Sequence, residues 1–503
     1  MDTLQLVNYR KFKDTGVIHL KPITFLVGAN SSGKSSFLKF FPLLKQSLGV
    51  NRNGTFLWYS TDVDFKDFQN TVHNGEGNID IELTFPLPNM RHQRLGRRSN
   101  EQVNVLTDND IQEKVELTVK LEISGKKKNE KTNEDFLSLL SIQYLDQFVQ
   151  IQINEDEKAK VVINDRVIDA VLHPSLNNNS IRLLPRIYEE CDDNLYSGEI
   201  QTAVSFLRKN FDVEDEKQTL SFMELEDAFY LLSKSASFKY LKSMNFDGEE
   251  TLLNDMYILL HLNEIIDDIN YYLYDVSSSI TYVRPLRVTT ERYYRYQNYA
   301  VDEIDSDGKN LAMYLANLSD RQMIKFMDWT SKLFGFSIVV LKHEGHVELQ
   351  IREGGKEPRN LVDTGFGYTQ LLPIVTMIWN ALKSPSKRTF YRGRGKSPKY
   401  IVIEQPELHL HPRLQAKFGA MLAKVIEGGE GNNLKFIIET HSEAILNSIG
   451  VQIEKNELHS EKVNVVLFNA DAEGYDNYIE EVQYNERGFM EHWPTGFLSE
   501  DVY

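Results

Sequence analysis

The sequence predicts an α/β fold that combines a core of buried strands and helices, a lobe of mixed β-sheet and a helical insertion. The almost wholly apolar segment Ile23–Val27 is followed by a glycine-bearing turn and a helical stretch, as in a strand that is buried on both faces and feeds a helix. Near the C-terminus, Tyr400–Ile403 and Phe436–Ile438 are also apolar, and each leads into a turn and a helical stretch. In contrast, Ile79–Phe85 and Val115–Ser124 alternate apolar and polar residues, which indicates half-exposed strands.

The chain divides into three predicted parts. Residues 1–185 form an N-terminal lobe with the glycine-bearing turn, and residues 278–503 form a C-terminal lobe. Between them lies a predicted helical insertion, residues 186–277, because Ser197–Tyr274 carries Leu, Phe, Lys, Glu and Asp at helical spacing and lacks proline. The polar run Gly125–Asp135 predicts a loop tip between two strands.

Composition narrows the class of protein. The 503 residues are 41% hydrophobic and 26% charged, which is ordinary for a globular chain, and the formal net charge is -17. An acidic surface repels phosphodiester backbones, so any contact with nucleic acid must use a local basic patch. A single cysteine, Cys191, suits a reducing compartment, and neither a signal peptide nor an apolar run of about 18 residues is visible. We therefore expect a cytoplasmic protein with no membrane contact.

The segment Gly28–Ser35 reads GANSSGKS and fits the pattern G-x-x-x-x-G-K-[ST]. Its glycines allow backbone N–H groups to turn inward around phosphate oxygens, and the helix N-terminus that follows adds positive potential. Lys34 would then reach the β- and γ-phosphates, and the Ser35 hydroxyl would bind Mg²⁺. A strand before the segment and a helix after it are the context that this motif requires.

Three further segments carry chemistry. Glu404 ends an apolar strand, where a carboxylate can hold Mg²⁺ through water. His441 follows another apolar strand and can donate a hydrogen bond to a γ-phosphate, although Thr440 or Ser442 beside it can simply cap the next helix. Asp363–Pro373, DTGFGYTQLLP, places two glycines and a hydroxyl before a helix, which is either an anion site or a plain capped loop.

Taken together and in this order, the four segments resemble the ABC-type ATPase heads of the RecF, SMC and OLD (overcoming lysogenization defect) group. Gly28–Ser35 resembles Walker A, Tyr400–Glu404 resembles Walker B, Asp363–Gln370 resembles a divergent signature motif, and His441 resembles the switch histidine. The opening NYRKF and the closing WPTGF (Trp493–Phe497) are similar to stand-alone prokaryotic OLD-like ATPases of anti-phage defence, with the Septu and PARIS systems as the nearest resemblances.

The resemblance implies a homodimer or higher homo-oligomer with ATP and Mg²⁺ as cofactors. The signature of one subunit would close head-to-tail on the γ-phosphate that the other subunit's Walker A segment holds. Mg²⁺ would be held by Ser35 and Glu404, and His411 lies where a dimer-interface aspartate usually stands. The implied nucleotide contacts are Gly28, Asn30, Ser31, Ser32, Gly33, Lys34, Ser35, Ser36, Gly365, Gly367, Thr369 and Gln370.

One position departs from the family pattern. Most ABC heads have a glutamate directly after the Walker B acid, and that glutamate activates water, but here the residue is Gln405. An amide can orient a water and cannot take its proton, and general-base help is typically worth about 10²–10⁴-fold. Slow hydrolysis with Gln405 positioning water, hydrolysis with Glu407 as the base, and a switch that holds ATP without turnover remain open. The catalytic candidates are therefore Glu404, Gln405, Glu407 and His441.

Partners follow from what the chain contains. Asp471 and Glu473 after an apolar strand fit a β-hairpin turn better than a nuclease site, so we expect no nuclease activity in this chain. The resemblance to the Septu and PARIS systems implies a separately encoded effector nuclease instead. Three basic clusters, Arg91–Arg98, Lys126–Lys128 and Lys387–Lys399, suit either solvated loops or nucleic acid. The arginine–aromatic run Tyr282–Arg295 suits either nucleic acid or a strand that leads into a structured loop, with Arg287 paired to an acid. A RecF-like repair ATPase acting directly on DNA is the rival interpretation. The Q-loop glutamine is left among Gln143, Gln147 and Gln150.

Overall fold

The computed structural model describes most of the chain, with gaps that include residues 87–115 and 190–261. The described residues are 1–52, 54–86, 116–129, 132–144, 147–156, 158–167, 172–175, 182–189, 262–287, 291–296, 301, 303–383, 398–429, 433–469 and 478–490. The chain forms two compact units. Unit 1 comprises Met1, Leu48–Thr55 and Asn78–Tyr274, and unit 2 comprises Asp2–Ser47, Phe56–Gly77 and Asp275–Tyr503.

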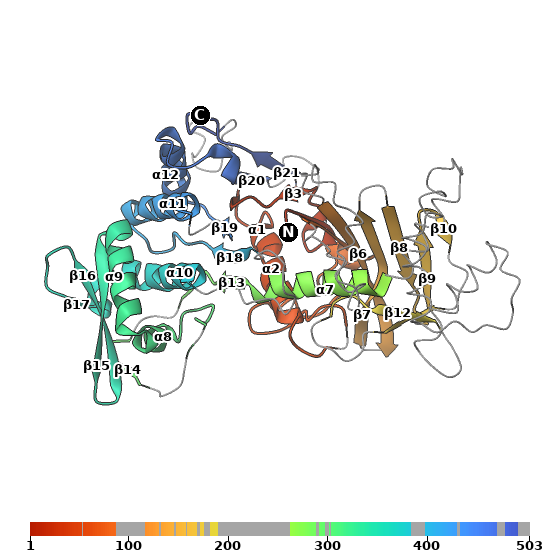
Figure 1. The fold of residues 1–503 in the computed structure, drawn as a ribbon, viewed down its shortest axis with the longest axis horizontal. Helices are drawn as coiled ribbons and strands as arrows, with labels where there is room; N and C mark the ends of the chain where they lie inside the picture. Colours follow the sequence, from red (N-terminus) through yellow and green to blue (C-terminus); the bar gives the residue numbers. More distant parts are fainter. Residues whose placement is uncertain are drawn as a thin grey trace, which may run out of the picture. The chain divides into compact units, whose positions relative to one another are not determined.

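Unit 1 is built on antiparallel strands (Figure 1). Each strand pairs with a sequence neighbour, except that β11 reaches across to both β9 and β12. Apolar residues alternate along β5, β8 and β9, so one face of the sheet is buried. The strands are β5 (Ile79–Pro86), β6 (Glu116–Asn129), β7 (Thr132–Tyr144), β8 (Gln147–Ile153), β9 (Ala159–Ile163), β10 (Arg166–Val167), β11 (Leu172–Ser175) and β12 (Arg186–Glu189).

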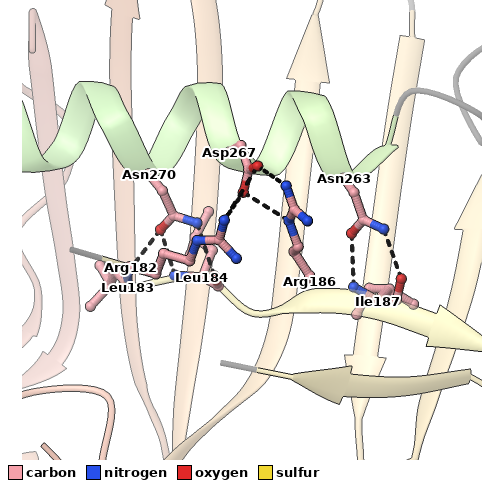
Figure 2. Close-up of polar contacts among 8 residues, drawn as sticks. All are labelled: Arg182, Leu183, Leu184, Arg186, Ile187, Asn263, Asp267 and Asn270. Atoms are coloured by element: carbon pink, nitrogen blue, oxygen red, sulfur yellow. Dashed lines mark hydrogen bonds and ion pairs between the residues drawn. The ribbon is translucent and has the colours of Figure 1, made fainter. Parts of the chain in front are cut away.

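Helix α7 (Leu262–Ser278) fastens the segment Arg182–Ile187 within unit 1 (Figure 2). The amides of Asn263 and Asn270 each donate to and accept from its backbone at 2.8 to 2.9 Å. Between them, the carboxylate of Asp267 pairs with Arg182 and Arg186. These three helical residues are spaced four and three apart, so they lie on one face of the helix.

The centre of unit 2 is a six-stranded sheet in the order β13-β18-β19-β4-β20-β21. Neighbouring strands are parallel from β13 to β20, and β21 pairs antiparallel with β20. Strands β4, β18 and β19 are almost entirely buried, which is the pattern of a parallel sheet covered on both faces. The strands are β13 (Ile280–Val283), β18 (Lys399–Glu404), β19 (Leu434–Glu439), β4 (Ile23–Gly28), β20 (Val463–Asn469) and β21 (Tyr478–Val482).

A different set of helices covers each face of this sheet. On one face α1 (Lys34–Leu38) and α2 (Phe40–Ser47) pack against the strands, and the ring of Phe41 stacks on Tyr400 at 6.2 Å between centroids. The alternate residues, among them Ile401 and Phe436, belong to a core shared with the other helices. Those helices are α8 (Leu311–Asn317), α9 (Asp320–Phe334), α10 (Phe366–Lys383), α11 (Pro412–Glu427) and α12 (Glu443–Glu454).

Two smaller groups of antiparallel strands complete unit 2. One is a ribbon that packs on α9. It comprises β14 (Tyr294–Arg295), β15 (Phe336–His343), β16 (His346–Glu353) and β17 (Arg359–Asn360). The other pairs β1 with β2 and β3. It comprises β1 (Thr3–Tyr9), β2 (Phe12–Asp14) and β3 (Ile18–His19). Short 3-10 turns cover His73–Gly75, Leu361–Thr364 and Ser460–Lys462.

The expected α/β class, with a sheet lobe and a phosphate-loop core, is confirmed. The predicted hairpin after Val463–Asn469 is also present, since β21 returns antiparallel, although Asp471 and Glu473 lie outside the described residues. The loop predicted at Gly125–Asp135 is wrong, because β6 and β7 extend through most of it and pair there. Of the expected helical insertion, residues 186–277, the described residues form strand β12 (Arg186–Glu189), where the helical prediction is wrong, and helix α7, which is helical as expected.

Candidate functional site

The Gly28–Ser35 loop joins β4 to α1, as the motif requires. A Cβ on Gly28 would lie 2.1 Å from the carbonyl oxygen of Phe468 on the neighbouring strand β20. A Cβ on Gly33 would lie 2.6 Å from the ring of Phe12, and its φ of 107° is in the region that glycine favours. Both glycines are therefore required by close approach, and they hold the turn against β2 and β20.

Lys34 lies inside this loop, with only 3% of its surface exposed. Its ammonium donates hydrogen bonds to the carbonyl oxygens of Gly28 at 2.9 Å and Ala29 at 2.6 Å. Burial lowers the pKa of Lys34, while Glu439 and Glu407 nearby act to raise it. The loop is thus folded around a positive charge in the position where the motif needs one for phosphate oxygens.

Two carboxylates meet the loop at the C-terminal ends of adjacent parallel strands. Glu404 ends β18 and Glu439 ends β19, and the two residues are paired in register. Glu404 lies an even number of residues after Tyr400, and Glu439 lies an even number of residues after Ile437. Each carboxylate therefore projects to the same face of the sheet as that earlier residue, which is the face that α1 and α2 cover. Strand β19 lies between β18 and β4, so Glu439 stands between Glu404 and the loop.

The two carboxylates have different partners. The Ser35 hydroxyl donates a hydrogen bond to Glu439 Oε1 at 2.9 Å, whereas Glu439 Oε2 is buried without a hydrogen-bond partner among the described residues. Glu404 Oε1 instead accepts from the Tyr282 hydroxyl on β13 at 2.5 Å. Sequence reasoning missed Glu439. The available signal was an acid at the end of the apolar strand Phe436–Ile438, directly before Thr440 and His441.

Electrostatics at this point favour a cation. Burial raises the pKa of both Glu404 and Glu439, and the Lys39 ammonium at the end of α1 lowers both. Two buried carboxylates and a hydroxyl are the hard oxygen donors that Mg²⁺ prefers, and the unpartnered Glu439 oxygen leaves a coordination position for it. The described residues contain no cluster of three or more His, Cys, Asp or Glu that could hold a metal without the help of other ligands.

Gln405 and Glu407 follow β18 in a tight turn. Gln405 has a φ of 44°, and its backbone N–H donates to the Glu439 carbonyl oxygen at 2.9 Å. The Glu407 carboxylate accepts from the backbone N–H of His441 at 2.7 Å and from the Thr440 hydroxyl at 2.8 Å. Glu407 therefore positions the turn that carries His441 in this structure. Burial, followed by Lys34, lowers the pKa of His441.

The signature segment begins α10 and faces outward. Gly365 has a φ of 87° and open space where a Cβ would stand, and the next residue, Phe366, is 64% exposed. The side chains of Thr369 and Gln370, which the resemblance assigns to the nucleotide, face inward instead. The Thr369 hydroxyl donates to the Phe366 carbonyl oxygen at 2.7 Å, and Gln370 is 3% exposed. Gly367 packs near the carbonyl oxygen of His409, and His411 is exposed where it caps α11.

Arg287 connects this segment to the Walker B strand. It is 5% exposed and donates to the Glu404 carbonyl oxygen at 3.2 Å, and its own carbonyl oxygen accepts from Gln370 at 3.4 Å. Burial lowers the pKa of Arg287 to about 10, with Glu407 acting in the opposite direction. The neighbouring arginines are also engaged, since Arg284 pairs with Asp62 and Arg292 pairs with Asp363. Three arginines of the run thus contact other residues of unit 2, whereas Tyr293 and Arg295 are exposed.

The remaining sequence candidates belong to unit 1 or lie mostly outside the described residues. Gln143, Gln147 and Gln150 belong to β7 and β8 of unit 1, where Gln147 accepts from Asn164. Trp493–Phe497 and the clusters Arg91–Arg98 and Lys387–Lys399 lie outside the described residues, except that Pro398 and Lys399 of the last run are described. Among the described helices, none has the length and apolar character needed to cross a bilayer.

Comparisons with known proteins agree with the P-loop geometry. A family profile described as an AAA ATPase domain matches residues 1–446. No curated protein matches the chain significantly.

Among solved structures, similarity extends to SMC head domains. The head from Pyrococcus furiosus, bound to a ScpA domain, is 10% identical with a TM-score of 0.32, and 96% of each chain is covered. The head from Thermotoga maritima is 12% identical with a TM-score of 0.34, covering 96% of this chain and 98% of that one. The head from Pyrococcus yayanosii is 10% identical with a TM-score of 0.33, and 97% of each chain is covered. Scores this low support no conclusion about activity. On the profile match, which spans most of its length, the chain belongs to the AAA ATPase domain family.

Proposed function

We propose that this protein is an ATP-binding ATPase head that dimerises head-to-tail around ATP. The observation that carries the proposal is the set of contacts around the loop: Lys34 is buried in it, Ser35 donates to Glu439, and Glu404 stands one strand further along. A buried lysine and backbone N–H groups suit the phosphates of a nucleotide. The oxygen ligands for Mg²⁺ come from Ser35 and the carboxylates that end β18 and β19.

Dimerisation is supported by the outward-facing signature segment. Phe366 is 64% exposed at the start of α10, and its ring lies 6.0 Å from that of the exposed His409. An exposed aromatic side chain beside backbone N–H groups at a helix N-terminus suits a surface that is covered by a second, anion-bearing subunit. Backbone groups of Gly365–Gly367, and not the Thr369 or Gln370 side chains, would then approach the partner's γ-phosphate.

The direct test of this function is the mass of the protein in solution. With ATP and Mg²⁺, light scattering should show a dimer or higher oligomer, and with ADP it should show the smaller species. An unchanged mass with ATP, in a sample that demonstrably binds ATP, would contradict head-to-tail closure.

Turnover is the part of the function that Gln405 limits. Glu407 is held by His441 and Thr440, and so it serves turn positioning more readily than proton abstraction. Slow hydrolysis with Gln405 orienting water is the proposal, and a nucleotide-gated scaffold with little hydrolysis is the second candidate that the amide favours. Gln405→Glu should raise turnover by about 10²-fold if the water is already placed. If turnover stays flat in that variant while ATP still closes the dimer, the scaffold candidate is preferred.

In the cell, we propose that the head senses or controls a separately encoded effector nuclease in prokaryotic anti-phage defence. Support comes from the family resemblance of the N-terminal segment, and the rival RecF-like role on DNA is weakened because Arg284 and Arg292 pair with carboxylates and Arg287 is buried. Co-purification with the product of the adjacent reading frame would support defence. Salt-dependent binding of the isolated protein to duplex DNA would favour the repair role instead.

A further inference from the structure

We propose that Glu439, at the end of β19, is the carboxylate that anchors the divalent cation together with Ser35. Glu404 is then the secondary carboxylate of the same cation site. The inference rests on the proposed ATP-binding function and deepens it. The Walker B resemblance places this role on Glu404, whereas the contacts in this structure place Glu439 at the loop.

The order of the strands places Glu439 next to the loop. Strand β19 lies directly beside the loop strand β4, with Glu439 paired to Leu26, while β18 is one strand further away. A carboxylate that ends β19 is therefore closer to the start of α1 than one that ends β18. The Ser35–Glu439 hydrogen bond of 2.9 Å is the direct evidence of that proximity.

The hydroxyl hydrogen of Ser35 is directed at Glu439. A serine that binds a metal through its oxygen must give its hydrogen to another acceptor, and the acceptor orients the lone pairs toward the metal. Glu439 Oε1 already accepts that hydrogen. Its second oxygen, Oε2, is buried and has no hydrogen-bond partner among the described residues, in a residue that is only 2% exposed. A buried carboxylate oxygen without a donor is a strong ligand that is ready for a cation.

Glu404 is held by a hydrogen bond from another strand. Its Oε1 is occupied by the Tyr282 hydroxyl, which comes from β13 on the side of β18 away from β19. Tyr282 is itself buried, so this hydrogen bond holds the Glu404 side chain toward β13. Glu404 can add charge and receive a metal-bound water, but its first oxygen is already committed. Glu439 thus anchors the cation, and Glu404 adds negative charge beside it.

The proposal predicts unequal losses of metal affinity. Protein saturated with a non-hydrolysable ATP analogue is titrated with Mn²⁺, and the electron paramagnetic resonance signal of free Mn²⁺ reports binding. Glu439→Gln should raise the Kd for Mn²⁺ by about 10–100-fold, and Glu404→Gln by clearly less. Tyr282→Phe, which frees Glu404, should leave the Kd near that of the wild type. A larger loss in Glu404→Gln than in Glu439→Gln would overturn the assignment.

Two further measurements separate a metal role from a folding role. Binding of the ATP analogue in EDTA should be the same in Glu439→Gln and the wild type, and its loss there would overturn the proposal in favour of a structural role. In addition, Ser35→Ala should cost little Mn²⁺ affinity when added to Glu439→Gln, because the two residues act together. Additive losses would contradict the coupling. If the wild type binds no nucleotide in EDTA or with Mn²⁺, the ATP-binding function itself fails, which is a different result from unequal variants.

Discussion

The two glycine-bearing turns of unit 2 both precede a helix, but they are built in opposite ways. In the Gly28–Ser35 loop, close approach to Phe468 and Phe12 leaves no room for a side chain at either glycine, and the ammonium of Lys34 is bound by loop carbonyls. At the signature turn, a Cβ on Gly365 would meet nothing within 4 Å, and Phe366 projects outward.

The difference indicates which half of a nucleotide site is complete within one chain. The first turn is packed, charged and joined to the carboxylates that end β18 and β19, so it is preorganised for phosphate and cation. The second has its hydroxyl turned inward and its apolar side chain exposed, which suits the proposed contact with another surface. The proposed function therefore assigns the binding site to the first turn and the cover for a second copy's site to the second turn.

The largest expected effect lies in the packed turn. Lys34→Ala removes the charge-assisted hydrogen bonds to phosphate and should weaken ATP binding by roughly 100-fold, equivalent to about 3 kcal/mol. Isothermal titration with ATP measures this loss. Lys332→Ala is the matched control, because that side chain is 73% exposed on α9. Equal affinities in both variants would refute the role of the loop.

Paired glycine substitutions sharpen the comparison of the turns. Gly28→Ala places a methyl group 2.1 Å from the Phe468 carbonyl oxygen and should lower the free energy of unfolding by roughly 3 kcal/mol. Gly365→Ala meets open space and should lower it by only about 1 kcal/mol, the cost of its φ of 87°. Urea denaturation distinguishes these results. Similar losses at both positions would show that the turns do not differ in packing.

An exposed aromatic at the signature turn should matter for assembly alone. Phe366→Asp should weaken ATP-dependent dimerisation by roughly 30-fold while leaving ATP affinity unchanged, because a buried aromatic anchor is typically worth about 2 kcal/mol. Analytical ultracentrifugation with ATP reports the change. Ile324→Asp is the control, since Ile324 on α9 is similarly exposed, at 66%. A dimer that both variants form equally well would remove Phe366 from the interface.

The smallest effect is a pH dependence of stability. Burial raises the pKa of Glu439 above its ordinary value of 4.5, so the folded chain retains a proton that the unfolded chain has lost. Its contribution to stability therefore falls as pH rises through the raised pKa. Without metal, Glu439→Gln should melt at a higher temperature than the wild type at pH 8, and the difference should shrink toward pH 4.5. A difference that grows on acidification would contradict the sign.

Local sequence signals predicted the packed turn well and the carboxylate arrangement only in part. Gly28, Lys34 and Ser35 can be identified from the sequence because the strand, the loop and the helix that position them are contiguous. The importance of Glu439 depends on β19 lying between β18 and β4, and the order of strands in a parallel sheet is a long-range property that spacing does not reveal. The sequence leaves Arg287 either in a structured loop with an acidic partner or at a nucleic acid, whereas the fold buries it against the Glu404 carbonyl oxygen. Thr369 and Gln370 face inward because α10 begins at Phe366, one turn earlier than expected.

Mixing two defective variants tests the shared site most directly. Lys34→Ala keeps an intact signature turn, and Phe366→Asp keeps an intact phosphate loop, so with ATP each variant alone should dimerise far more weakly than the wild type. Mixed in equal amounts, they can form one complete site, and native mass spectrometry should then show a heterodimer that carries a single ATP. If the mixture stays monomeric while the wild type dimerises with ATP, the two turns do not meet across one nucleotide, and the account is wrong.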